Sequence, residues 1–343
     1  MTSVKVFCWT RRAAWARKLT FALLNISVGL LVTLSVSHAA DKLRIGYASP
    51  SVNVAMLWVT HEAKLFAKNG LEVEVLFIES ALVQRAMISG EIQLAMMTGG
   101  LMAAPRLAGA DLSMIAGFIT RYVSRVMVRP EIAKPTDLKG KRAGIVRLGA
   151  AADRGLRLVL SRWGLNPDKD LTFLQVPGGE PARIAALSAN SIDVSLINPP
   201  YHKKGIEAGL KVLANMEDMD IPIQHIGLVT TQRLISKSPD VVRRTVKSYA
   251  EGIQVMRTNP KLAKAALSKY MRITDDGELA ETYQLLKKLV PVKPYPTLEG
   301  FRVVLDELSE KIPAAKTANP KDFTDTRFLE ELDRSGYFDQ ISK

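Results

Sequence analysis

The chain contains a single cysteine, Cys8, among its 343 residues. One thiol near the N-terminus excludes a disulfide framework and a zinc site made of cysteine thiolates. The sequence also lacks a Gly-x-x-x-x-Gly-Lys segment, so the phosphate-binding loop of a nucleotide hydrolase is absent. It contains no Gly-x-Ser-x-Gly segment, which excludes the nucleophile turn of an α/β-hydrolase.

Positive charge is in excess but is not concentrated anywhere. Lys and Arg outnumber Asp and Glu by 47 to 34, which gives a formal net charge of +13. The basic residues are spread along the chain, and no basic run alternates with aromatic residues. Because nucleic-acid-binding proteins gather basic residues into a patch or stripe, we expect no nucleic-acid partner. The excess suits an anionic ligand, or serves solubility alone.

Residues 1–39 have the layout of a cleavable secretory signal peptide. A basic start without acidic residues precedes an apolar run from Leu19 to Val36, and Ser37-His38-Ala39 places small residues before a cleavage point after Ala39. We therefore expect the protein in the periplasm. The apolar run is near the lower length limit for spanning a bilayer, so an uncleaved anchor stays open as an alternative. Arg11-Arg12 leaves twin-arginine export open beside the general secretory route.

Two stretches one hundred positions apart resemble each other: 88–100 reads ISGEIQLAMMTGG and 188–200 reads SANSIDVSLINPP. Each contains a helix end, a Gly or Asn break, an apolar strand and then a polar residue with a Gly or Pro pair. Each closes a β-α-β-α-β pattern whose strands are expected at 43–48, 71–78, 92–97, 142–147, 171–176 and 192–197. Such patterns predict parallel strands with right-handed crossovers. The sequence therefore predicts two α/β lobes of similar topology.

The remaining segments predict how the lobes connect. Residues 112–129 are expected to cross from the first lobe to the second as a strand with a bend near Thr120–Ser124, and 221–231 to return. One helix is expected from Val54 to Asn69, a second is expected to be capped by Ser80, and the chain beyond Ser238 has a helical pattern. The final segment, DFTDTRFLEELDRSGYFDQI, is expected to be a helix with a short tail.

The repeated stretches also predict a ligand site. In open α/β sheets, ligands bind beyond the carboxyl ends of the strands, where the following helices present free N–H groups. Gly99-Gly100 would let the backbone approach a ligand closely. Pro199-Pro200 would fix the chain direction and leave Asn198 to form hydrogen bonds. Two lobes that face each other across these edges would enclose a cleft.

The segments LRIGYASPSVNVAMLWVTHEAKLFAKNGLEVEVLFIES, ALVQRAMISGEIQLAMMTGG, DLKGKRAGIV and DFTDTRFLEELDRSGYFDQI resemble the periplasmic substrate-binding proteins of nitrate/sulfonate/taurine-type ABC transporters, the SsuA/THI5-like or NMT1-like family. The resemblance covers nearly the whole chain after the leader. It implies the type II periplasmic-binding-protein fold, with two doubly wound lobes joined by two hinge strands. The lobes would comprise residues 40–120 with 222–343 and residues 121–221. The implied partners are a membrane permease and a separate ATPase chain.

By that resemblance, the ligand contacts come from loops at the strand ends and from the hinge turn: Tyr47, Ser49, Ser51, Asn53, Thr98, Gly99, Gly100, Leu101, Arg121, Arg147, Gly149, Ala150, Ala151, Asn198, Pro199 and Tyr201. Many sulfonate binders carry hydroxyl residues where this chain has Gly149-Ala150-Ala151. Arg147 is interpreted as a clamp for a carboxylate or sulfonate, or as a partner of Asp153. Arg121 and Arg125 are interpreted as hinge-surface charges or ligand contacts.

Aromatic and histidine candidates have competing interpretations. Tyr47 and Tyr201 suit either ligand contact or packing at the edge of the core. His61-Glu62 lacks the second histidine of a zinc protease helix, since Leu65 stands at that position. His202 and His225 are interpreted as structural histidines with satisfied hydrogen bonds. We expect no catalytic residue, metal or cofactor, and a monomer.

The sequence thus favours the solute-binding component of an ABC importer, one that captures a small anionic organic ligand of sulfonate or carboxylate type by hinge closure. Two alternatives stay open. The first is an enzyme on the same fold, of the pyrimidine-precursor synthase or lyase type. The second is a sensory ligand-binding partner of a membrane receptor, because transport and signalling both use closure of the cleft.

Overall fold

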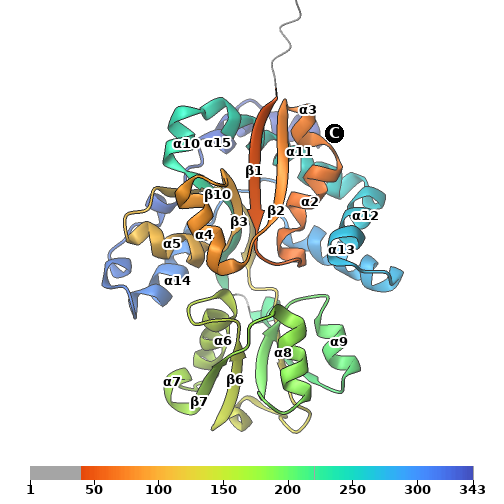
Figure 1. Ribbon diagram of the computed structural model, residues 1–343, viewed down its shortest axis with the longest axis vertical. Helices are drawn as coiled ribbons and strands as arrows, with labels where there is room; N and C mark the ends of the chain where they lie inside the picture. The colour runs from red at the N-terminus through yellow and green to blue at the C-terminus, as the bar shows by residue number, and fades with distance from the viewer. Residues whose placement is uncertain (1–39, 220, 343) are drawn as a thin grey trace, which may run out of the picture. The chain divides into compact units, whose positions relative to one another are not determined.

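The computed structural model describes residues 40–219 and 221–342, and the predicted leader lies outside these residues (Figure 1). The strands are β1 (Asp41–Tyr47), β2 (Leu71–Phe77), β3 (Leu94–Met97), β4 (Leu112–Arg121), β5 (Arg125–Val128), β6 (Lys141–Ile145), β7 (Leu171–Gln175), β8 (Val194–Ile197), β9 (Lys211–Asn215) and β10 (Pro222–Thr231). The α-helices are α2 (Ala55–Glu62), α3 (Leu65–Lys68), α4 (Ser80–Ser89), α5 (Gly99–Leu107), α6 (Ala151–Arg162), α7 (Pro167–Asp170), α8 (Gly179–Ser188), α9 (His202–Glu207), α10 (Gln232–Lys237), α11 (Pro239–Thr258), α12 (Pro260–Met271), α13 (Asp276–Leu289), α14 (Leu298–Ser309), α15 (Arg327–Arg334) and α16 (Tyr337–Ile341).

The described strands form two five-stranded sheets with the same architecture. The first has the order β2-β1-β3-β10-β4, and the second has the order β7-β6-β8-β5-β9. In each sheet the first three strands are parallel, and the other two pair antiparallel. The repeated stretches end in β3 and β8, which occupy the same third position. The prediction of two α/β lobes of similar topology is therefore confirmed.

Two segments of the chain connect the sheets. The bend predicted near Thr120–Ser124 separates β4 from β5, which belong to different sheets. The return segment enters β10, which pairs with β3 and β4 of the first sheet. The two crossings thus place strands from distant parts of the sequence beside each other, as the two-lobe interpretation requires.

Alternation along the strands explains how both faces of the first sheet are covered. In β3, Leu94 and Met96 belong to one apolar cluster, whereas Ala95 and Met97 belong to another. Successive strand residues point to opposite faces, so each face needs its own helices. Helices α2, α11 and α12 pack together on the face of Leu94 and Met96 (Figure 1). Helices α5 and α14 pack on the other face.

A pair of glycines shows that the repeat extends to packing. A Cβ on Gly46 of β1 would lie 2.7 Å from Cδ1 of Ile92, and a Cβ on Gly144 of β6 would lie 2.2 Å from Cδ1 of Ile192. Both isoleucines are buried and stand shortly before the third strand of their sheet. The absence of a side chain on each glycine lets the isoleucine pack directly on the strand backbone.

Three local predictions were wrong. The helix expected from Val54 to Asn69 is divided into α2 and α3, because Lys64 adopts a left-handed conformation with φ of 56°. Ser80 does not cap α4, since the helix begins at Ser80 and Glu79 is the N-cap. The terminal helix is divided by Gly336, which has φ of 68°, into α15 and α16. At Lys64 and at Gly336, a single residue with positive φ interrupts the helical pattern.

Candidate functional site

The N-terminus of α5 lies directly after β3, at the edge where the sequence predicts a ligand. Thr98 is the N-cap, and its hydroxyl accepts a hydrogen bond of 3.2 Å from the N–H of Leu101. Gly99 and Gly100 form the first turn and are buried, as is Leu101. A Cβ on Gly99 would lie 2.5 Å from the carbonyl oxygen of Gln224 in β10. Gly99 is thus required for packing against the return crossing.

The close neighbour of Gly100 is a charged side chain from the second half of the fold. A Cβ on Gly100 would lie 2.3 Å from Nη2 of Arg154, 2.5 Å from its Cζ and 2.7 Å from its Nε. Arg154 belongs to α6, beside the second sheet. Its Nη2 is buried and has no hydrogen-bond partner among the described residues. A guanidinium therefore lies at the N-terminus of α5, where the helix dipole is also positive.

Arg147 adds a second positive charge to this region. It lies between β6 and α6 and is partly exposed. Burial lowers the pKa of its guanidinium, and the nearby charge of Arg154 lowers that pKa further. Two cations close enough to influence each other favour an anion between them.

The alternative in which Asp153 pairs with Arg147 at the surface is wrong in its geometry. Asp153 is buried, with 1% of its surface exposed. It accepts hydrogen bonds of 2.6 Å from the N–H of Gly149 and from Nε of Arg157. These bonds hold the turn from Gly149 to Ala150, the residue before α6, and the helix itself starts at Ala151. Asp153 therefore stabilises the start of α6.

The charge of Arg154 acts on three further titratable groups. Tyr122, in the hinge turn, is buried, and its ring centroid lies 5.2 Å from that of His225 in β10. Burial lowers the pKa of His225 to about 4, and Arg154 contributes to this shift, so the ring is neutral at pH 7. Both carboxylate oxygens of Glu307 in α14 are buried without a hydrogen-bond partner in the described part of the chain. Burial raises the pKa of Glu307 to about 7, although the charge of Arg154 opposes the rise.

The turn after β1 contributes unpaired polar atoms. Ser51 is fully buried and Asn53 is 7% exposed. The Ser51 hydroxyl and Asn53 Oδ1 lack hydrogen-bond partners within residues 40–219 and 221–342. A buried polar group without a partner costs about 1–3 kcal/mol, so such atoms are suited to contact a ligand. Ser49 is half-buried, and its carbonyl accepts a 2.9 Å hydrogen bond from the N–H of Ser51.

Tyr47 has the packing role that the sequence left open. It is buried and lies edge-on to Trp58 and to Phe77, with ring centroids 5.6 Å apart in both pairs. Burial raises the pKa of its hydroxyl. Phe77, in contrast, is 60% exposed at the end of β2. An exposed aromatic ring thus follows the second strand, at a position that the sequence analysis did not select.

Asn198 is engaged in the protein's own hydrogen bonds rather than left available. Its Oδ1 accepts a 2.7 Å hydrogen bond from the hydroxyl of Ser124, and its Nδ2 donates to Oε1 of Glu180 at 2.9 Å. It therefore ties the hinge turn to α8. Tyr201 is partly buried beside the small cluster under α8 and α9, and Lys204 lies 5.9 Å from its ring centroid.

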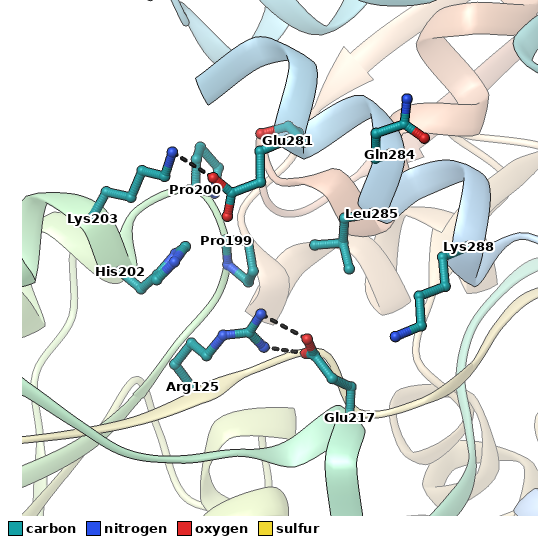
Figure 2. A pocket seen from close by; sticks show the side chains of 11 residues that line it. Arg125, Pro199, Pro200, His202, Lys203, Glu217, Glu281, Gln284, Leu285 and Lys288 are labelled. Atoms are coloured by element: carbon teal, nitrogen blue, oxygen red, sulfur yellow. Dashed lines mark hydrogen bonds and ion pairs between the residues drawn. The ribbon is translucent and has the colours of Figure 1, made fainter. Parts of the chain in front are cut away.

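A pocket of about 250 Å³ lies beside Pro199 and Pro200 (Figure 2). Figure 2 shows α13 on one side, with Glu281 and Leu285, and Lys203 opposite, joined to Glu281 by an ion pair of 2.6 Å. Its other lining residues are Arg125, His202, Glu217, Thr282, Gln284 and Lys288. The ion pair joins a helix packed on the first sheet to one packed on the second. Among the sequence-predicted residues that the structure describes, Pro199 lines this pocket.

The two hinge arginines differ from each other. Arg121 is exposed at the end of β4, as a surface charge would be. Arg125 is not a surface charge: its side chain is 11% exposed and binds both carboxylate oxygens of Glu217. The interpretation of His225 as a satisfied histidine was also wrong, since its buried Nε2 has no partner among the described residues.

The structure brings together residues that the sequence selected and residues that it missed. Gly100, which the sequence selected, meets Arg154, which it did not select. Glu307 comes from a helix far along the chain, and no local pattern marks it. Within residues 40–219 and 221–342, no group of three or more His, Cys, Asp and Glu side chains is placed to hold a metal ion.

The fold consists of two five-stranded sheets with equivalent strand orders, which two segments of the chain connect, and helices begin at the ends of the strands. These features define a two-lobed protein with the periplasmic-binding-protein fold. A family model described as NMT1/THI5 like matches residues 51–263. The chain belongs to this family. The expectation drawn from the sequence resemblance is therefore confirmed, both for the family and for the fold.

Solved structures agree on the fold. The periplasmic aliphatic sulphonate binding protein SsuA from Escherichia coli aligns with a TM-score of 0.68 at 18% identity, over 84% of this chain and 99% of that one. The alkanesulfonate-binding protein SsuA from Xanthomonas axonopodis pv. citri, bound to MOPS, aligns with a TM-score of 0.65 at 19% identity, over 80% and 94%. At this identity the likeness establishes the fold alone.

A curated relative from Brachyspira hyodysenteriae is described as an ABC transporter periplasmic binding protein. It is 22% identical over 134 residues, which are 39% of this chain and 38% of the relative. The match thus spans well under half of either protein. Among the described helices of the present chain, none combines the length and the apolar character needed to cross a membrane.

Proposed function

We propose that the protein is the extracytoplasmic solute-binding component of an ABC importer and that it captures a small anionic organic ligand, of carboxylate or sulfonate type. The observation that carries the proposal is the position of Arg154. This residue of α6 places its guanidinium against Gly100 at the N-terminus of α5. An anion held there would contact elements of both lobes at once.

The charges at this position support an anion. Arg154, Arg147 and the N-terminus of α5 are all positive, and the Asp153 carboxylate is already engaged by Arg157 and Gly149. Charge-assisted hydrogen bonds of an oxyanion to a guanidinium and to helix N–H groups are among the strongest in proteins. Ser51 and Asn53 would supply further polar contacts after β1.

Hinge closure is the corresponding binding mechanism. The lobes would be residues 40–120 with 222–343 and residues 121–221, and the segments between β4 and β5 and before β10 would absorb the motion. The ligand would shift the population towards the closed form by contacting both lobes. The ion pair between Lys203 and Glu281 would form only when the lobes are close.

The proposal includes the surroundings of the protein. Residues 1–39 would direct export to the periplasm and be removed after Ala39, which N-terminal sequencing of the exported protein would reveal. A membrane permease and a separate ATPase would receive the solute. We propose a monomer that binds its ligand without transforming it, so incubation should return the solute chemically unchanged by mass spectrometry.

A binding screen tests the proposal. Protein lacking residues 1–39 should be purified without refolding and examined by native mass spectrometry for a retained solute. A panel of carboxylates and sulfonates should then raise the thermal transition, and isothermal titration should give a dissociation constant. Arg154→Gln should weaken binding of the anion, whereas the matched change Arg302→Gln on α14 should not. Absence of any retained solute and of any shift across the panel would refute the proposed function.

A further inference from the structure

Gly155 lies inside α6, where glycine is less favourable than every residue except proline. A glycine at such a position usually has a packing reason. Here a Cβ on Gly155 would lie 2.9 Å from Cε1 of Tyr122, 3.3 Å from its Cζ and 2.9 Å from Cδ1 of Leu196. Contacts below 3.0 Å are essentially never seen for real Cβ atoms, so the missing side chain is what allows α6 to pack directly on the Tyr122 ring.

The Tyr122 ring contacts elements that belong to both sheets. Gly155 lies on α6, which packs on the second sheet, whereas His225 lies in β10 of the first sheet, with its ring centroid 5.2 Å from that of Tyr122. The Tyr122 side chain is buried, with 2% of its surface exposed. Because buried side chains are closely packed, the ring has little space in which to move away from α6.

The chain is anchored on either side of Tyr122, to a different sheet each time. The residue before it, Arg121, pairs with Pro222 at the end of the first sheet. Two residues after it, the hydroxyl of Ser124 donates a 2.7 Å hydrogen bond to Oδ1 of Asn198, which follows β8 of the second sheet. A rotation of one sheet relative to the other would therefore have to be absorbed close to Tyr122 in this crossing.

Arg154 directly precedes Gly155 in α6, and its guanidinium lies against Gly100 at the start of α5. Neighbouring residues of a helix move together, so the depth at which α6 packs on the Tyr122 ring also sets how far the guanidinium reaches. We propose that Tyr122 is a positioning residue for the anion site: its ring, packed on Gly155, holds α6 where Arg154 meets the N-terminus of α5. This inference rests on the proposed function, because it concerns the same anion site.

The two neighbours of Gly155 differ in what they contribute. Leu196 belongs to β8, in the same sheet on which α6 packs, and supports the helix from within one lobe. Tyr122 belongs to the bend between β4 and β5, and so connects the position of α6 to the state of the hinge. The guanidinium would then be aligned with α5 only in the hinge state that seats the ring on Gly155.

Substitutions on both sides of the contact test the proposal, with isothermal titration of propanesulfonate and of butanoate as probes. Gly155→Ala should weaken anion binding on the order of tenfold, because it pushes α6 from the ring and displaces a charge-assisted contact. Gly205→Ala is the matched control: Gly205 is a buried helical glycine of α9, and its Cβ would lie 2.5 Å from Cε of Met127 in the second sheet. It should leave the affinity unchanged.

Variants of the ring itself provide the complementary comparison. Tyr122→Leu removes the ring atoms that face Gly155 and should weaken binding on the order of tenfold. Tyr122→Phe keeps these atoms and should restore the wild-type affinity. Circular dichroism at the temperature of the titration would establish that each variant is folded.

A double-mutant cycle distinguishes positioning from a general packing role. If the ring acts through Arg154, Gly155→Ala should weaken binding in the wild type but have no further effect in an Arg154→Gln background. Equal losses of affinity in both backgrounds would refute the proposal. So would native affinity in folded Gly155→Ala, a loss in Gly205→Ala as large as that in Gly155→Ala, or a loss in Tyr122→Phe as large as that in Tyr122→Leu. None of these results would affect the proposed function.

Crystal structures without ligand give a readout that does not depend on binding. In Gly155→Ala and Tyr122→Leu the Arg154 guanidinium should be displaced from Gly100, whereas in Gly205→Ala and Tyr122→Phe it should remain there. Failure of every anion to bind the wild type would refute the proposed function, and these structures would still decide the positioning role. An Arg154 guanidinium that keeps its place in both Gly155→Ala and Tyr122→Leu would refute that role.

Discussion

The paired glycines at the start of α5 provide a test in which adjacent substitutions should have opposite consequences. Gly99→Ala places a methyl group 2.5 Å from the backbone carbonyl of Gln224, and contacts below 3.0 Å are essentially never seen for real Cβ atoms. The carbonyl belongs to β10 and has little freedom to move. Gly100→Ala instead meets the far end of the Arg154 side chain, which is able to rotate away.

The magnitudes follow from these neighbours. Overpacking of a rigid core costs about 1–3 kcal/mol. Replacing glycine by alanine in a helix returns up to about 1 kcal/mol, less near the terminus. Gly99→Ala should therefore lower the free energy of unfolding by about 2 kcal/mol, equivalent to a fall of about 3 °C in Tm for a chain of this length. Gly100→Ala should change stability by less than about 1 kcal/mol but weaken anion binding about tenfold, since it moves the guanidinium from the helix N-terminus.

Urea denaturation followed by circular dichroism, together with isothermal titration of the best anion, would measure both effects. Gly277→Ala is the matched control, because Gly277 lies in the first turn of α13, is exposed, and would place its Cβ 3.2 Å from the Asp275 side chain. It should leave stability and binding unchanged. If Gly99→Ala is as stable as the wild type, or if Gly100→Ala is the destabilised variant with native affinity, the assignment of these contacts is wrong.

Three further predictions follow from the charges. Burial raises the pKa of Glu307 to about 7, so the folded state holds a proton that the unfolded state releases. The free energy of unfolding of the wild type should therefore fall by on the order of 3 kcal/mol as the pH rises from about 4.5 to 7. Glu307→Gln should remove this fall in urea titrations at pH 5 and 8, and an equal fall in both proteins would contradict the prediction. Hydrogen bonds from Arg142 lower the pKa of Asp193 to about 2, against the effect of burial. Asp193→Asn should therefore lower the free energy of unfolding by about 2 kcal/mol at pH 7, and the difference from the wild type should disappear as the pH falls from about 4 to 2. A difference in stability that does not depend on pH would refute this. Glu281→Gln breaks the 2.6 Å ion pair with Lys203, and because the Glu281 side chain is 59% exposed, stability should change by less than about 1 kcal/mol. If closure forms this pair, ligand affinity should fall severalfold in titrations, and unchanged affinity would argue against closure there.

Much of the architecture could be predicted from the sequence because it depends on local periodicity. The alternation in LAMM, residues 94–97, gives a strand with two buried faces, and the equivalent VSLI stands one hundred positions later in the same place of the second sheet. The bend at Thr120–Ser124 also follows from composition. Helix ends were less accurate, since Lys64 adopts a left-handed conformation that no glycine or asparagine announces.

The site was predictable only in part. Thr98, Gly99 and Gly100 were selected because they follow a strand, and the structure places them at a buried helix N-terminus. Asn198 was selected on the same reasoning, but its amide is occupied by Ser124 and Glu180. The position of a residue after a strand indicates which edge it reaches, but not which neighbours use its hydrogen bonds.

The sequence by itself determined the two lobes and the doubled β-α-β-α-β unit, because these depend on repeating patterns of apolar residues within short windows. Only the tertiary structure decided that Arg154 lies against Gly100 and that its charge acts on Glu307, more than one hundred and fifty residues further along. Such contacts depend on how helices from separate sheets pack, and no property of the residues at either position encodes the identity of the other.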